Sequence, residues 1–186
     1  MSLDRILVGL CREPISGYEL KAVFDQAIRY FWSAELSQIY PTLHRLEAAG
    51  LLESKNAPPA KGPRRRLYRT TPTGREKLRQ WLEEGPAFRD ERYVFAAQVF
   101  FLDELGDLDA TTAFVRKFKA EFERRHQALT AVEEADTELQ TDDRHDLGPD
   151  EFHHYLTLRM GIHVVEARIA WCDEALGLIE ARKEQQ

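Results

Sequence analysis

The residues best suited to chemistry lie in a segment that is predicted to be the third helix, over residues 37–49. Its inner face is apolar, because Ile39, Leu43 and Leu46 recur at helical spacing. The opposite face and its flanks carry hydrogen-bonding groups that can reach base edges and phosphates in a DNA major groove. These candidate DNA-binding residues are Ser37, Gln38, Tyr40, Thr42, His44 and Arg45. A polar helix face is by itself also typical of a solvated surface.

A basic cluster follows in a predicted hairpin, whose strands are residues 51–55 and 65–70. Three prolines between the strands exclude a helix or a central strand there. The cations at and beside the turn are Lys61, Arg64, Arg65, Arg66 and Arg69. Alternation along a strand places Arg64 and Arg66 on one face. A basic run is often only solvated surface, but here it follows the polar helix in the order and spacing of one DNA-binding motif.

These features are positioned by elements that predict a winged helix-turn-helix domain over residues 1–85. Two helices precede the third one, and a fourth follows the hairpin. We expect the helices near residues 2–11, 16–27 and 37–49, and from Thr71 or Thr73 to about residue 84. The fold class is mainly α with a small β-hairpin wing.

Four positions set the predicted helix ends. Ser16 and Glu19 have the spacing of a capping box at the start of the second helix. Pro41 requires the third helix to begin only shortly before it, because a proline deep in a helix costs about 3 kcal/mol. Ser37 is therefore the expected N-cap, and Gly50 the residue that ends this helix.

Residues 86–186 are predicted to form an α-helical dimerisation domain, after a boundary at Gly85-Pro86. We expect helices near residues 93–105, from Asp109 or Thr111 to about 139, and from an Asp150 cap to about 182. Gly106 ends the first of them.

The last helix carries two apolar stripes at helical spacing. The first holds Tyr155, Leu158, Ile162, Val165, Ile169, Cys172 and Leu176, and the second holds Phe152, Leu156, Met160, Val164, Ala167, Trp171, Ala175 and Leu178. One stripe can pack within its own chain, so the other needs a partner, and a two-fold copy is the commonest one. We predict a homodimer with the first stripe as its interface. The alternative is that both stripes lie in the core of a single bundle.

Charge is distributed unevenly along the chain of 186 residues. The formal net charge of -6 argues against a nucleic-acid partner. However, residues 1–87 carry 14 Lys and Arg against 10 Asp and Glu, a net +4, while residues 88–186 carry 12 against 22, a net -10. This asymmetry is typical of a basic binding module joined to an acidic one. The chain shows neither a signal peptide nor a membrane span, and we expect a cytoplasmic protein.

Other candidate chemistry is weak. Among His153, His154, His163 and Glu166, nothing supplies a third ligand at a diagnostic spacing, so neither a metal site nor a cofactor is predicted. The two cysteines, Cys11 and Cys172, are expected to be buried reduced thiols. The sequence contains no nucleophile motif, P-loop or dinucleotide fingerprint, which argues against an enzyme.

Several aromatic residues could line an apolar effector pocket near the junction of the two halves. The candidates are Trp32, Trp81, Tyr93 and Phe100. Ordinary core and dimer packing explains the same residues, so the pocket is a hypothesis with an open alternative.

The first 80 residues closely resemble the PadR family of transcriptional regulators. The resemblance rests on Ser16-Gly17-Tyr18-Glu19-Leu20, Ile39 to Glu47 with its Tyr40-Pro41 pair, Gly50-Leu51-Leu52, Gly62-Pro63-Arg64-Arg65, Tyr68 and Thr71-Pro72-Thr73-Gly74. Thr70 departs from the pattern, since the family usually has an aliphatic residue there. The second half resembles the longer members only in its helical, acidic character.

This resemblance implies a homodimeric repressor that is relieved by a small aromatic or drug-like effector. It also implies that Tyr40 contacts a phosphate and that Gln38, Thr42 and Arg45 read bases. Two-fold symmetry then predicts a palindromic double-stranded DNA operator. The competing hypothesis is a winged-helix protein–protein interaction module without DNA binding, which would have little use for the wing arginines.

Overall fold

The computed structural model describes residues 2–57, 65–87, 93–135 and 147–185. The chain forms two compact units, Met1–Arg89 and Asp90–Gln186, and each is described by itself. Within the described residues, no helix is both long and apolar enough to cross a membrane.

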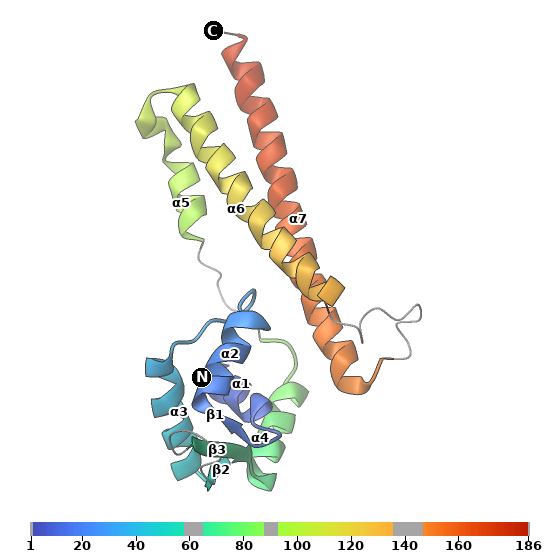
Figure 1. Cartoon of the computed structure of the whole chain (residues 1–186). Coiled ribbons are helices and arrows are strands. Elements are labelled where there is room, and N and C mark those ends of the chain that lie inside the picture. Colours follow the sequence, from blue (N-terminus) through green and yellow to red (C-terminus); the bar gives the residue numbers. More distant parts are fainter. Residues whose placement is uncertain (1, 58–64, 88–92, 136–146, 186) are drawn as a thin grey trace. The chain divides into compact units, whose positions relative to one another are not determined.

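The first unit has the predicted winged helix-turn-helix architecture (Figure 1). Its elements are α1 (Ser2–Leu10), β1 (Ile15–Ser16), α2 (Gly17–Gln26), α3 (Leu36–Ala48), β2 (Leu52–Ala57), β3 (Arg65–Thr70) and α4 (Pro72–Glu83). The first three helices converge on one core, in which Leu7, Leu20, Phe24, Ile39 and Leu43 are completely buried. The inner face that the sequence assigns to the third helix is therefore confirmed.

The sheet contains one strand that the sequence analysis did not predict. Strand β3 pairs antiparallel with both β2 and β1, in the order β1-β3-β2. Ser16 in β1 also caps α2: its Oγ accepts from the Glu19 N–H, and its own N–H donates to the Glu19 carboxylate. The predicted capping box is confirmed. Because β1 has only two residues, it carries no periodic pattern by which a strand could be recognised.

The ends of α3 and α4 confirm two predictions and correct a third. Gly50, at a φ of +69°, follows α3 as expected, and Thr71 caps α4 by accepting from the Gly74 N–H. The predicted N-cap Ser37 is wrong, because Glu35 is the N-cap and α3 begins at Leu36.

Thr70, which departs from the family pattern, is buried in the core. Its side chain hydroxyl donates a 2.6 Å hydrogen bond to the Val8 carbonyl, and its N–H donates to the Cys11 carbonyl. The hydroxyl and the N–H of Thr70 both have acceptors, so burying this residue leaves neither donor unsatisfied.

In its described residues, the second unit contains helices and no strand. It contains α5 (Val94–Phe100), the short 3-10 helix η1 (Leu102–Leu105), α6 (Leu108–Ala135) and α7 (Pro149–Lys183). Figure 1 shows α6 and α7 side by side. The single helix predicted over residues 93–105 is broken at Phe101, although Gly106 ends the segment with a φ of +63°, as expected.

The start of α7 differs from the prediction. Gly148 is the N-cap and Pro149 the first helical residue, so the expected Asp150 cap is wrong. Proline is favoured at this position because its missing N–H would have no partner within the helix and its φ suits the first turn.

Candidate nucleic-acid interface

Helix α3 presents a polar face to solvent, opposite its buried apolar face. Ser37, Gln38, His44 and Arg45 are exposed. Gln38 also contributes to the start of the helix, since its side chain oxygen accepts a 3.0 Å hydrogen bond from the Glu35 N–H. This bond satisfies one polar group at the helix end and fixes one end of the Gln38 side chain.

Thr42 does not lie on the exposed face where the sequence analysis placed it. Its relative exposure is 8%, and its hydroxyl donates to the Gln38 carbonyl one turn earlier at 2.8 Å. A threonine inside a helix commonly makes this bond, which uses the donor that a base edge would need. The expectation that Thr42 faces the groove is therefore wrong.

Tyr40 is half-buried at the contact between α2 and α3. Its ring meets the Tyr18 ring edge-on, with centroids 6.3 Å apart. A Cβ atom added to Gly17 would lie only 2.7 Å from the Tyr40 ring, so a larger residue at position 17 would require the Tyr40 side chain to shift. Burial raises the pKa of the Tyr40 hydroxyl, which keeps it a neutral donor.

Arg45 is held by a carboxylate from α1. Its two terminal nitrogens donate to the two oxygens of Asp4 at 2.6 and 2.7 Å, in a bidentate pair. The hydrogen bond to Arg45 lowers the pKa of the Asp4 carboxyl. These two hydrogen bonds use two of the five N–H donors of the guanidinium. The Nε–H is not one of the two.

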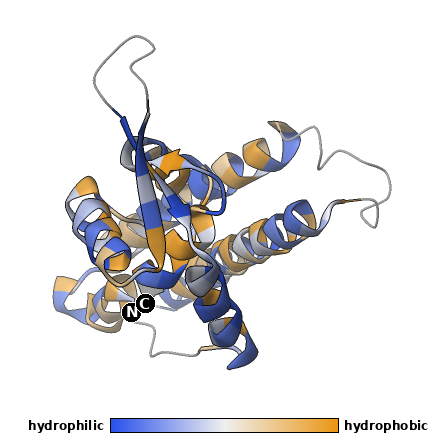
Figure 2. Ribbon diagram, turned by 90° about the horizontal axis from the view of Figure 1, so that it is seen from below, coloured by the Kyte–Doolittle hydropathy of each residue, from blue (hydrophilic) through white to orange (hydrophobic). Residues whose placement is uncertain are grey.

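The wing cations are divided between the two faces of β3. Arg66 shares a face with buried Tyr68, and its guanidinium lies over the Tyr68 ring, 5.5 Å from the centroid. Arg65 and Arg69 lie on the other face and are exposed. The ends of β2 and β3 nearest the turn are hydrophilic (Figure 2). Lys61 and Arg64 fall outside the described residues, so the shared face predicted for Arg64 and Arg66 stays a prediction.

Arg66 is bound on the α3 side of the wing. It donates to both carboxylate oxygens of Glu47, at 2.8 and 2.7 Å, and through Nε to Ser54 at 2.7 Å. Neither Asp4 nor Glu47 was predicted from the sequence to be a site residue. No local pattern reveals them, because each pairs with an arginine far away in the chain.

The structure shows which of the two stripes on α7 is packed within its own chain. Leu158, Ile162, Val165 and Cys172, from the stripe predicted to be the dimer interface, are at most 6% exposed within the chain. Tyr155, Ile169 and Leu176 in the same stripe are half-buried. The second stripe is the open one, with Leu156, Met160, Val164, Trp171 and Leu178 between 37% and 66% exposed. The interface assignment was wrong because periodicity identifies both stripes but not the one that packs on α6.

The four aromatic residues predicted to line a pocket are divided between the units. Trp32 packs against the winged core, and Trp81 lies 5.5 Å below the Arg5 guanidinium, beside a cleft of about 270 Å³. Tyr93 contacts Phe95, and Phe100 is 79% exposed. A single pocket shared by all four stays a prediction.

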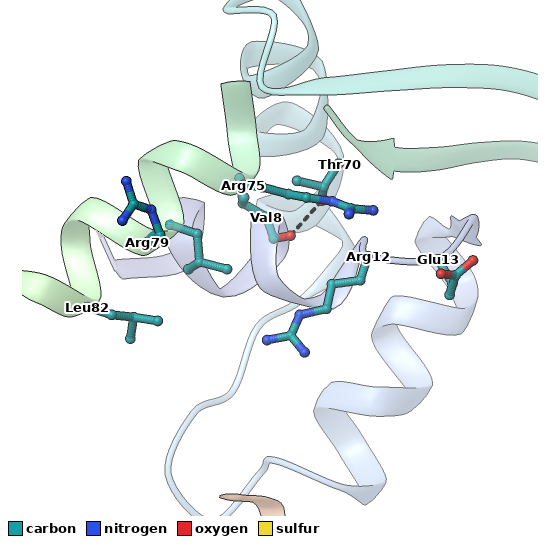
Figure 3. Close-up of a pocket in the computed structure, with 8 residues that line it drawn as sticks. Val8, Arg12, Glu13, Thr70, Arg75, Arg79 and Leu82 are labelled. Carbon is teal, nitrogen blue, oxygen red and sulfur yellow. Dashed lines mark hydrogen bonds between the residues drawn. The ribbon is translucent and has the colours of Figure 1, made fainter. Parts of the chain in front are cut away.

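A second cleft of the winged unit, of about 400 Å³, lies between α1, β3 and α4 (Figure 3). Its lining consists of Val8, Arg12, Glu13, Thr70, Arg75, Leu78, Arg79 and Leu82. This cleft was not predicted from the sequence, because its residues come from α1, the segment after α1, β3 and α4.

Titratable groups elsewhere form pairs rather than a metal centre. Glu166 contacts His163 at 3.0 Å and His126 at 3.3 Å, but nowhere in the described part of the chain are three such groups arranged to hold a metal ion. Cys11 and Cys172 are both buried and free, as predicted, and burial raises the pKa of Cys11 to about 12.

A three-helix unit with a polar third helix and a basic hairpin defines the winged helix-turn-helix class of DNA-binding proteins. Residues 6–80 match the family model described as the transcriptional regulator PadR-like family, and residues 91–180 match the model described as virulence activator alpha C-term. Residues 6–80 therefore form a domain of the PadR-like family of transcriptional regulators. This membership confirms the prediction that it is not an enzyme.

Two relatives match nearly the whole chain. A probable transcriptional regulator of Mycobacterium tuberculosis is 29% identical, over 96% of this chain and 97% of its own. The negative transcriptional regulator PadR of Bacillus subtilis is 24% identical over the same shares.

Solved structures of the Bacillus subtilis protein share the fold. The complex with operator DNA superposes with a TM-score of 0.82 and 23% identity, over 96% of this chain and 99% of that one. The complex with p-coumaric acid gives 0.77 and 24%, over 97% and 99%.

Proposed function

We propose that this protein is a homodimeric repressor that binds a palindromic operator and is released by a small aromatic effector. The observation that carries the proposal is the exposed polar face of α3 beside a basic wing, in a unit with a net charge of +4 over residues 1–87. A cytoplasmic location, where DNA is accessible, is part of the proposal.

On the operator, α3 would enter the major groove. Ser37, Gln38 and His44 are exposed and carry donors and acceptors suited to base edges, and Arg45 offers its Nε edge. Tyr40 would donate to a phosphate. Thr42 has no direct role in this proposal, because it is buried.

The wing would contact the DNA backbone. Arg65 and Arg69 are exposed on the outer face of β3, and Lys61 and Arg64 belong to the turn by sequence. Cations of this kind add affinity for every DNA sequence through phosphate contacts, and they add salt dependence.

Homodimerisation is supported by the open apolar stripe of α7, from Leu156 to Leu178. An apolar face of this length on a regulator needs a partner, and a second copy pairs the same face with itself. The symmetric pair would place two copies of α3 about one helical turn of DNA apart.

An effector is supported by the complex of the Bacillus subtilis relative with p-coumaric acid and by the aromatic residues of both units of this chain. Titration of the tryptophan fluorescence with a panel of phenolic acids tests it. A quench that saturates and releases DNA is expected, and a silent panel would argue against an effector of this class.

DNA binding itself is tested with purified protein and its own promoter region, at about 50 and 200 mM salt. Affinity should fall steeply with salt, because phosphate contacts release counterions. Arg69→Ala should weaken binding to all sequences alike, and Gln38→Ala should reduce the preference for the promoter over scrambled DNA.

Arg116→Ala, which removes an exposed arginine of α6, is the matched control and should leave binding unchanged. If the wild-type chain binds no DNA at low salt, the interaction-module hypothesis gains and the repressor proposal fails.

A further inference from the structure

Three side chains from three elements meet between the recognition helix and the wing. Glu47 comes from α3, Ser54 from β2 and Arg66 from β3. Ser54 Oγ donates to Glu47 at 2.6 Å, Arg66 Nε donates to Ser54 Oγ at 2.7 Å, and Arg66 Nη2 donates to both Glu47 oxygens. We call these three residues the wing clamp. Its hydrogen bonds form a closed ring, so each member orients the other two.

The wing clamp lies where the hairpin leaves the core. Tyr68, which pairs with Ser54, is 1% exposed, whereas Asn56 and Arg66, the next pair on this face, are exposed. The Arg66 guanidinium lies over the Tyr68 ring, which fixes its plane. We therefore expect the orientation of the next strand pair, Ala57 and Arg65, relative to α3 to depend on the wing clamp.

We propose that Glu47 is a positioning residue for DNA binding, which sets the angle between the wing and the recognition helix without contacting DNA itself. The inference rests on the proposed function, because the angle between the wing and α3 matters in this way only if the winged unit binds DNA. Arg66, predicted from the sequence as a DNA contact, then acts mainly inside the protein. The lowered pKa of Glu47, caused first by the Ser54 hydroxyl and then by Arg66, agrees with a permanently ionised clamp.

The Glu47→Gln substitution distinguishes a positioning role of Glu47 from a direct effect of its negative charge on DNA binding. Removing a negative charge beside DNA should strengthen binding if charge alone matters. A disturbed wing angle should instead weaken promoter binding about tenfold, the equivalent of one charge-assisted hydrogen bond. The slope of log affinity against log salt should also become shallower, by about 0.9 for each phosphate that the wing no longer reaches.

Glu53→Gln is the matched control. Glu53 is an exposed carboxylate of the same wing, opposite Arg69, and outside the clamp. The substitution removes the same charge, so we expect unchanged or slightly tighter binding.

A nitroxide label at Lys55→Cys reports on the wing directly, in the free full-length protein. Lys55 is exposed and lies on the face opposite Ser54, and both native cysteines are buried. The spectrum should show an ordered label in the wild type and in Glu53→Gln, and a mobile one in Glu47→Gln. If Glu47→Gln does not fold, Ser54→Ala opens the ring without changing charge and should mobilise the label to a lesser degree.

The proposal is overturned if Glu47→Gln binds DNA as Glu53→Gln does, or if it binds more weakly while the label stays ordered. The label arm uses no DNA. A wild-type chain that fails to bind DNA would therefore refute the proposed function, whereas an ordered label in a folded Glu47→Gln protein refutes the clamp alone.

Discussion

The winged unit and the helical unit bury their apolar residues to different degrees. In the winged unit, large apolar side chains of α1, α2 and α3 are almost completely buried within one chain. In the helical unit, α5 has no buried residue, and Val94, Phe100, Phe101 and Leu105 are more than half exposed. The second stripe of α7 is open as well. The difference agrees with the proposed homodimer, in which a second copy would cover the apolar residues that the helical unit leaves exposed.

Charged side chains differ between the units in the same sense. In the winged unit, Asp4 and Glu47 each hold an arginine through at least two hydrogen bonds and connect separate elements. In the helical unit, Lys119 pairs with Asp173 and Arg159 with Glu133 across α6 and α7, alongside pairs within one helix. The ion pairs of the winged unit thus connect several elements, whereas those named for the helical unit connect α6 with α7.

The largest effect should come from the winged core. Phe24→Ala removes a completely buried ring and should lower the free energy of unfolding by about 3–5 kcal/mol, since a cavity remains. Urea denaturation followed by circular dichroism measures it. Phe31→Ala, at a ring that is 43% exposed, is the control and should cost about 1 kcal/mol or less. Equal losses in the two variants would contradict a core that is complete within one chain.

The next effect concerns the open stripe of α7. Val164→Glu buries an unpaired charge in the proposed dimer interface, at about 3 kcal/mol, so the dimer dissociation constant should rise roughly a hundredfold. Sedimentation velocity over a concentration series measures this constant. Ala170→Glu, on an exposed part of α7 outside both stripes, should leave it unchanged. A Val164→Glu protein that remains fully dimeric would place the interface elsewhere.

A smaller effect is expected at the Asp4–Arg45 pair. Asp4→Asn should destabilise the winged unit by about 1 kcal/mol or less, because Arg45 is half exposed and solvent screens the pair. It should also tighten binding to scrambled DNA, since an arginine beside the interface loses its counter-charge. Fluorescence polarisation with promoter and scrambled duplexes measures both affinities. Asp25→Asn, which breaks the exposed ion pair between Lys21 and Asp25 in α2, is the control and should change neither affinity. Equal affinities of the two variants would contradict the effect expected of Asp4.

The smallest effect is a dependence on pH. The folded pKa of Asp4 is lowered, first by its hydrogen bond to Arg45, so its stabilisation is fully present above the ordinary carboxyl pKa. It is lost as the pH falls through the lowered folded pKa. Wild type and Asp4→Asn should differ in unfolding free energy by less than about 1 kcal/mol. This difference should be constant from pH 7 to 5 and should shrink below about pH 4. Urea titrations at four pH values would show it, and a gap that widens in acid would reverse the assignment.

Local rules predicted much of the winged unit. Ser16 with Glu19, Gly50 and Thr71 act within a few residues, so their capping chemistry can be read from the sequence. Pro41 did not fix the start of α3, because it lies inside the helix, which begins at Leu36 after the Glu35 cap. Ser37 is a good capping residue in isolation, but the extended backbone at Glu35 places the helix start earlier.

Features that depend on distant contacts were not predictable. Thr42 lies on the polar side by residue type, and only the packing of α3 shows that it is buried. The two stripes of α7 are alike in composition, so the choice between self-packing and exposure depends on where α6 lies. Asp4 and Arg45 are 41 residues apart, and no periodicity connects them.

The close contact of Gly17 with Tyr40 has an evolutionary consequence. Because a Cβ atom at position 17 would lie 2.7 Å from the Tyr40 ring, a larger residue there would force the Tyr40 side chain to move. Among functional variants selected from a library randomised at both sites, we expect larger residues at position 17 to occur only with smaller ones at position 40. We therefore expect the residue types at positions 17 and 40 to be coupled in such a selection.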